Sequence, residues 1–139
     1  MKRGFIIASH RTLSAGLVET LRFFAGDDLN IEVVTAYMTN APVDEDLKQA
    51  VAKFDENEEL IILTDLMAGS VNQKAAMYLQ RPHTHLLTGM NLPLAMAFIM
   101  EPANQYLTTE RVAAIVKDAQ KQIVYVNQLN LEGEDDEDE

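Results

Sequence analysis

The 139-residue chain contains no cysteine, no long apolar run and no concentration of basic residues. Without cysteine it can form neither a disulfide framework nor a thiolate metal site, which fits a reducing compartment. Its apolar runs are shorter than the roughly 18 residues that a membrane span needs, and the run after Gly4 is too short for a signal-peptide core. Because a basic stripe is missing, binding to a nucleic-acid backbone is not expected. We therefore expect a cytoplasmic protein.

The negative charge of the chain is concentrated at its end. Seven acidic residues lie in residues 132–139, so the net charge of −11 leaves about −4 for the rest of the protein. Such a tail has almost nothing to bury, and its composition is typical of a solvated, disordered segment. We predict one domain over residues 1–130, with a single core, and an acidic disordered tail over residues 131–139.

Strand and helix signals alternate along the chain, which is typical of a parallel sheet covered by helices. Strands are predicted at residues 4–9, 31–36, 60–64 and 84–88. Helices are predicted at residues 12–24, around Leu47, Val51 and Phe54, from a capping box at 70–73, through Phe98, and from Thr108 or Thr109 onward. Residues 123–126 are β-branched and aromatic, which favours a final strand. The predicted fold class is α/β, a doubly wound sheet with helices on both faces.

Two residues that can carry chemistry stand where predicted strands end. His10 follows the apolar run at residues 4–9, and Asp65 follows the run at residues 60–64. The carboxyl ends of parallel strands share one edge of the sheet, where ligands usually bind. A carboxylate hydrogen-bonded to one nitrogen of an imidazole makes the other nitrogen a better nucleophile. We predict that His10 and Asp65 form such a pair.

The loops at this edge are small, polar and glycine-containing. They comprise residues 9–12, 65–70 and 88–91. Loops of this kind allow an anion to approach backbone N–H groups closely, and a helix beginning at Ser70 would add its positive end. A phosphate next to His10 is the natural expectation.

These residues together resemble a known family. The combination is an N-terminal apolar strand followed by Ser9 and His10, then Asp65 followed by a small-residue turn and Asn72, then the loop at residues 88–93. It resembles the enzyme IIA component of the mannose family of the bacterial phosphoenolpyruvate-dependent sugar phosphotransferase system. The resemblance covers about residues 3 to 128.

The resemblance implies a role for each site residue. By it, His10 takes a phosphoryl group from the histidine-containing phosphocarrier protein and passes it to a IIB component, which phosphorylates the sugar during transport. Asp65 orients His10, and Ser70, Gly69 and Arg11 lie where the phosphate would be bound. The scheme needs no metal or cofactor, and it reaches the membrane only through other transporter components, which also determine the sugar.

The family fold implied by the resemblance is a sheet of four parallel strands with an additional antiparallel edge strand. In the family that strand is exchanged across a homodimer, and residues 123–128 occupy its place in this chain. We therefore expect a homodimer.

The chain departs from the family pattern at two points. Arg11 stands where glycine usually follows the histidine, and residues 68–71 read Ala-Gly-Ser-Val where Gly-Gly-Ser-Pro is usual. An arginine there could clamp the incoming phosphate with two donors, or it would strain the turn if the backbone required a positive φ. It could also mark a specialised or impaired carrier.

Three other functions are alternatives to this one. A receiver domain would need an acidic pair after its first strand, which Ser9 and His10 do not supply. A flavodoxin-like module would use the hydroxyls of Ser9, Thr12 and Ser14 for the flavin phosphate, but the later loops lack aromatic residues to sandwich the flavin ring. The phosphotransfer subunit of dihydroxyacetone kinase shares the fold and the histidine, and it is the nearest alternative.

The remaining candidates are weaker. His83 and His85 alternate along the fourth predicted strand like a metal pair, but without a nearby carboxylate or cysteine in the sequence packing is favoured. Met67 and Met90 lie in the loops at the strand ends, where they would form an apolar rim for partner proteins.

Overall fold

The computed structural model describes residues 1–129. Its centre is one sheet of four parallel strands in the order β2-β1-β3-β4. The strands are β1 (Arg3–His10), β2 (Ile31–Ala36), β3 (Glu59–Thr64) and β4 (Thr84–Leu87). All four were predicted from the sequence. Because β1 and β3 are neighbours, His10 and Asp65 end up at the same edge of the sheet.

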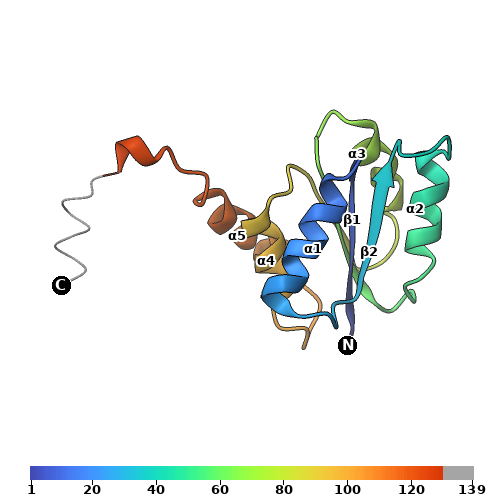
Figure 1. Cartoon of the computed structure of the whole chain (residues 1–139). Helices are drawn as coiled ribbons and strands as arrows, with labels where there is room; N and C mark the ends of the chain where they lie inside the picture. Colours follow the sequence, from blue (N-terminus) through green and yellow to red (C-terminus); the bar gives the residue numbers. More distant parts are fainter. Residues whose placement is uncertain (130–139) are drawn as a thin grey trace.

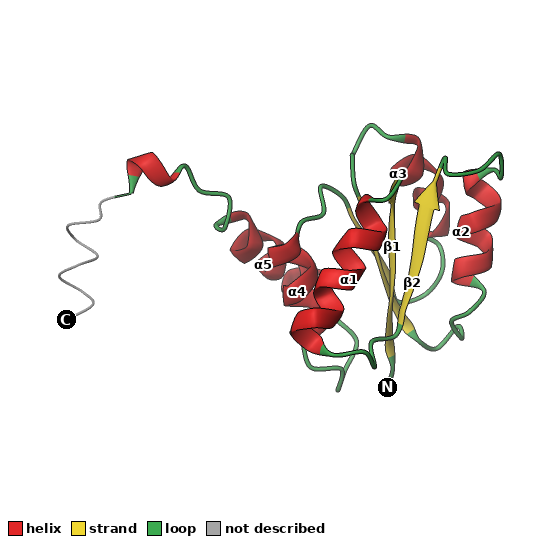
Figure 2. Cartoon of the chain, viewed as in Figure 1, coloured by secondary structure: helices red, strands yellow, loops and turns green. Residues whose placement is uncertain are grey.

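Helices cover both faces of the sheet, as Figures 1 and 2 show. One face carries α1 (Leu13–Ala25), α4 (Leu92–Met100) and α5 (Thr109–Gln120), and the other carries α2 (Val43–Val51), α3 (Ser70–Ala75) and the short 3-10 helix η1 (Ala76–Tyr78). The predicted doubly wound α/β fold is confirmed. Within residues 1–129, no helix is long and apolar enough to span a membrane.

The alternation of side chains along the strands divides the core into two halves. In β1, Phe5 and Ile7 pack toward α1, α4 and α5, whereas Ile6 and Ala8 pack toward α2 and α3. All six residues of β3 are buried. A strand buried on both faces reads as a continuous apolar run, which explains why the sequence reveals the central strands so clearly.

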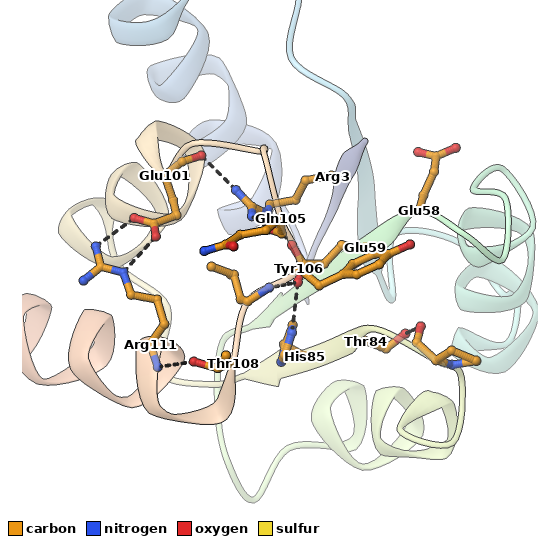
Figure 3. Close-up of polar contacts among 12 residues, drawn as sticks. Arg3, Glu58, Glu59, Thr84, His85, Glu101, Gln105, Tyr106, Thr108 and Arg111 are labelled. Atoms are coloured by element: carbon orange, nitrogen blue, oxygen red, sulfur yellow. Dashed lines mark hydrogen bonds and ion pairs between the residues drawn. The ribbon is translucent and has the colours of Figure 1, made fainter. Parts of the chain in front are cut away.

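A buried ion pair between Arg3 and Glu59 joins the amino ends of β1 and β3. The Arg3 guanidinium Nε donates to Glu59 Oε1 at 2.6 Å, and the other carboxylate oxygen of Glu59 accepts from the backbone N–H of Leu107 at 2.6 Å. Arg3 also donates to the carbonyls of Glu101 and Gln105. Figure 3 shows these contacts tying the loop between α4 and α5 to the starts of β1 and β3. Because both side chains are buried and hydrogen-bonded, the pair holds this loop in place.

The structure of the single chain differs from the sequence-based predictions at residues 123–126 and at Ser70. Residues 123–126 do not form a strand in the single chain; the backbone leads away from the body (Figure 1) and makes the 3-10 helix η2 at Val126–Gln128. The exchanged strand, which needs a second copy of the chain, stays a prediction. The capping box at Ser70 is absent, because Gly69 is the N-cap and no side chain caps the helix. Phe24, at the end of the helix predicted at residues 12–24, is exposed. The predicted tail at 131–139 lies outside the described residues.

A strand forms only beside another strand that satisfies its backbone N–H and C=O groups. Residues 123–126 follow soon after α5 and have no strand beside them within residues 1–129. The β-propensity of the segment therefore does not produce a strand by itself, because a strand also needs a neighbouring strand to pair with.

Candidate functional site

The His10–Asp65 pair lies at the carboxyl edge of the sheet. His10 is the last residue of β1 and Asp65 directly follows β3. The carboxylate oxygen Oδ2 of Asp65 lies 2.8 Å from the ring nitrogen Nδ1 of His10, and it also accepts the backbone N–H of His10 at 2.8 Å. The other oxygen, Oδ1, accepts the backbone N–H of Leu66 at 3.0 Å. The carboxylate is therefore fixed at both oxygens, and it fixes the imidazole in turn.

The charge of Asp65 decides which nitrogen of His10 is reactive. Burial by itself would raise the pKa of Asp65, but the hydrogen bonds from the backbone N–H and the ring of His10 outweigh it, so the pKa lies below its ordinary value of 3.8. The carboxylate is ionised at neutral pH and accepts a hydrogen bond from Nδ1–H. The lone pair of the neutral ring then lies on Nε2, which is the nucleophilic position.

The lowered pKa of Asp65 also predicts how the stability of the fold changes with pH. Because the pKa of Asp65 is lower in the folded protein than its ordinary value, its interactions with His10 stabilise the fold above about pH 3.8. That contribution decreases as the pH falls through the folded-state pKa and the carboxylate takes up a proton.

Gly69 explains why the turn after Asp65 must be small. A Cβ atom at residue 69 would lie 2.9 Å from Cε1 of His10, closer than real Cβ contacts. The turn therefore passes directly against the imidazole, and glycine leaves the ring room to sit beside it. The sequence predicted Gly69 as a site residue, and the structure places it in contact range of His10.

Ser70 and Arg11 are both hydrogen-bonded to Tyr37, a residue at the site that the sequence analysis missed. The Ser70 hydroxyl is hydrogen-bonded to the hydroxyl of Tyr37, and Nη1 of Arg11 donates to the carbonyl of Tyr37 at 2.7 Å. The Tyr37 ring stacks on His10 with 5.3 Å between ring centroids and 23° between planes. Tyr37 directly follows β2, and its position at the end of a strand next to β1 was the signal that could have identified it.

Arg11 adopts the left-handed conformation that was considered from the sequence. Its φ is 56°, a value that costs an L-residue roughly 1–2 kcal/mol and that glycine would adopt freely. The backbone N–H of Arg11 donates to the carbonyl of Ala36 at 2.8 Å, which joins the turn after β1 to the end of β2. The turn is therefore strained, as expected for a non-glycine residue at this position.

Two buried hydroxyls belong to the scaffold of the turn. Ser9 Oγ accepts the backbone N–H of Ser14 at 2.8 Å, and the Ser14 hydroxyl donates to the carbonyl of Val34 at 2.8 Å. These hydroxyls are therefore engaged with the backbone, which argues against the flavodoxin-like alternative that needs them for a phosphate.

The rim of the site is partly as predicted. Met67 is 77% exposed, and Leu66 and Leu13 are also exposed beside the histidine turn. Met90, however, is buried in the core against α4, so its placement on the rim was wrong. The exposed apolar side chains flank His10, which suits contact with a protein surface.

The other two histidines lie at the opposite end of the sheet. His85 Nε2 is 3.3 Å from Glu59 Oε2, within the buried cluster of Figure 3, and His83 stacks on Tyr106. His83 precedes β4 and does not share a strand face with His85. Residues 1–129 contain no group of three or more His, Asp or Glu side chains arranged for a metal ion.

Comparison with known proteins decides the family. A family model described as the fructose IIA component of the phosphotransferase system matches residues 4–125. The chain belongs to this family. Family membership gives the protein the coarse role of a sugar phosphotransferase IIA component with a phosphotransfer activity.

Solved structures agree with this assignment. A protein assigned to a phosphoenolpyruvate-dependent sugar phosphotransferase system permease of Klebsiella pneumoniae is 35% identical, with a TM-score of 0.84 over 92% of this chain and 93% of that one. The IIA protein associated with the fucose utilization operon of Streptococcus pneumoniae is 26% identical, with a TM-score of 0.76 over 92% and 96%. The mannose/sorbose-specific IIA subunit of Enterococcus faecalis is 21% identical, with a TM-score of 0.73 over 89% and 94%, and it supports the IIA fold.

Proposed function

We propose that this IIA protein is a cytoplasmic phosphoryl carrier that uses His10 as its acceptor. The observation that carries the proposal is the hydrogen bond between Asp65 and Nδ1 of His10, which leaves the lone pair on Nε2. The donor is the histidine-containing phosphocarrier protein, and the acceptor is a IIB component. The exposed apolar rim at Leu66 and Met67 supports a protein as the donor.

The proposed reaction is a ping-pong transfer through phosphohistidine. Nε2 of His10 attacks the phosphorus atom of the donor phosphohistidine, a new N–P bond forms, and the N–P bond of the donor breaks. The proton on Nδ1 stays hydrogen-bonded to Asp65, whose negative charge stabilises the positive ring. The N–P bond at His10 then breaks when the IIB component takes the phosphoryl group. No metal ion enters this scheme, because the donor is itself a phosphohistidine.

Three residues are proposed to contact the phosphoryl oxygens. Ser70 offers a hydroxyl, the turn at Gly69 passes against the imidazole, and Arg11 brings a positive charge to the same edge of the sheet. Donors fixed before the reaction stabilise charge without reorganising, which is the usual source of catalytic power in phosphoryl transfer.

The family fold adds the proposal of a homodimer with an exchanged strand at residues 123–128.

Phosphorylation of the wild-type protein tests the proposal. Incubation with phosphoenolpyruvate, the general phosphotransferase enzyme and the phosphocarrier protein is expected to add one phosphate per chain, measured by intact-protein mass spectrometry. The phosphate should be lost in acid, as expected for a phosphoramidate bond, and it should pass on to a IIB component. Failure to take up phosphate from the phosphocarrier would overturn the proposal. Transfer to a kinase subunit in place of IIB would favour the dihydroxyacetone kinase alternative.

Asp65→Asn is expected to slow phosphoryl transfer between about tenfold and about a thousandfold, the range for positioned acid–base partners. The amide is nearly isosteric, but it carries no negative charge to stabilise the positive ring. Rapid-quench measurement of phosphate transfer from the phosphocarrier gives the rate, and thermal unfolding serves as the control for folding. Unchanged kinetics would show that Asp65 serves only to hold the turn.

A further inference from the structure

Tyr37 contacts both groups that the proposed transfer uses. Its ring stacks on His10, with 5.3 Å between centroids, and its hydroxyl is hydrogen-bonded to Ser70. Asp65 holds one edge of the imidazole, and Gly69 lies against Cε1. Three residues from two loops therefore bound the imidazole: Asp65 and Gly69 from the loop between β3 and α3, and Tyr37, after β2, on the face of the ring.

The backbone of Tyr37 is held in an unfavourable conformation. Its φ is 67°, in the left-handed region that a bulky L-residue rarely adopts, and Arg11, which bonds its carbonyl, has a φ of 56°. Such residues persist only where the surrounding structure fixes them, and they cluster at functional sites. The two strained residues meet through the hydrogen bond from Nη1 of Arg11 to the carbonyl of Tyr37. Arg11 thus holds the carbonyl of Tyr37 in place.

Which of the two hydroxyls, Tyr37 or Ser70, donates in their hydrogen bond decides whether Ser70 can bind an anion. A serine hydroxyl has one proton and two lone pairs, and a tyrosine hydroxyl can donate or accept. If Ser70 donated its proton to Tyr37, it would present only lone pairs to a phosphoryl group and repel it. If Tyr37 donates to Ser70 Oγ, the proton of Ser70 is free to be donated to a phosphoryl oxygen.

We propose that Tyr37 is a positioning residue for phosphoryl transfer, because its ring fixes the plane of His10 while its hydroxyl donates to Ser70 and directs the serine proton toward the phosphoryl group. The inference rests on the proposed function of His10. It assigns Tyr37 two separable effects, one from the ring and one from the hydroxyl. It also gives Arg11 a part, as the residue that holds the Tyr37 carbonyl.

The two effects are separated by two substitutions. Tyr37→Phe keeps the ring and removes the hydroxyl, and it is expected to slow phosphate transfer from the phosphocarrier by up to about tenfold, because the Ser70 hydroxyl is then no longer oriented to donate to the charged phosphoryl group. Tyr37→Leu removes both and is expected to slow transfer further. Tyr106→Phe is the matched control, because it also loses a single hydroxyl hydrogen bond, to the carbonyl of Asn57, at the opposite end of the sheet. Its transfer rate should stay within about twofold of the wild type.

The decisive measurement is the coupling between Tyr37 and Ser70. Because the hydroxyl of Tyr37 acts through Ser70, Tyr37→Phe should slow transfer by less than about twofold in a Ser70→Ala background, whereas a purely structural effect would persist there. Full, additive slowing in that background, or an unchanged rate for Tyr37→Phe alone, would overturn the inference and leave His10 as the acceptor. A wild-type protein that takes up no phosphate would overturn the proposed function itself, and this inference with it.

Discussion

Replacing His10 with alanine is expected to abolish phosphate uptake completely. The nucleophilic lone pair is on the imidazole, and the other two histidines lie at the opposite end of the sheet, beside Glu59 and against Tyr106. The substitution should leave the turn folded, because the backbone N–H of residue 10 can still donate to Asp65 as it does in the wild type. Mass spectrometry after incubation with phosphoenolpyruvate, the general enzyme and the phosphocarrier measures the uptake.

The chain offers two matched controls for this experiment. His83 and His85 are the other histidines of the chain, and both lie at the amino end of the sheet, one against Tyr106 and the other beside Glu59. His83→Ala and His85→Ala should each retain one phosphate per chain. Phosphate retained by the His10→Ala protein would place the acceptor elsewhere and contradict the mechanism.

The positions of His10 and Asp65 were predictable because the topology of the parallel sheet alone brings them together. Two apolar runs that end in polar residues define two central strands, and parallel strands bring their carboxyl ends to one edge. Nothing beyond the strand assignments is needed to place these two side chains together. For the same reason, the hydrogen bond between them could be anticipated from residues 55 positions apart.

The place of Tyr37 at the end of β2 follows from the same topology, but its role could not be predicted from that place alone. Its role depends on a positive φ and on the partner of its hydroxyl, and neither is encoded in hydrophobic periodicity. The capping box at Ser70 failed for a related reason. Its hydroxyl satisfies the local sequence pattern, but a tertiary contact with Tyr37 takes that hydroxyl in the folded protein. Local patterns predict what a side chain can do, and tertiary contacts decide between the alternatives.

Residues 123–126 show why a strand signal in the sequence does not always predict a strand in the single chain. Residues 123–126 carry a strand signal, yet in the isolated chain Ile123 is 73% exposed and Tyr125 and Val126 are also exposed. Within the described residues, the strand β4 lies at the edge of the sheet and pairs only with β3. An open sheet edge and an exposed apolar segment in the same chain are features that a second copy can satisfy together.

Deleting all residues after Gln122 is expected to abolish the proposed homodimer and to yield aggregates or an unstable monomer. Exchange of residues 123–128 would bury apolar side chains, each contributing roughly 1.5 to 3 kcal/mol, and would pair backbone groups of the open edge in both subunits. Without the segment, the edge at β4 stays open to non-specific pairing. Sedimentation velocity of the full chain and the truncated chain measures the difference.

The acidic tail provides the control for this truncation. Deleting residues 132–139 removes seven acidic residues and keeps residues 123–128, so the dimer should persist unchanged, because a run of like charges has little apolar surface to bury in an interface. A stable monomer formed by the full chain would contradict strand exchange. So would an intact dimer formed by the chain that ends at Gln122, because the apolar segment is then shown to be unnecessary for association.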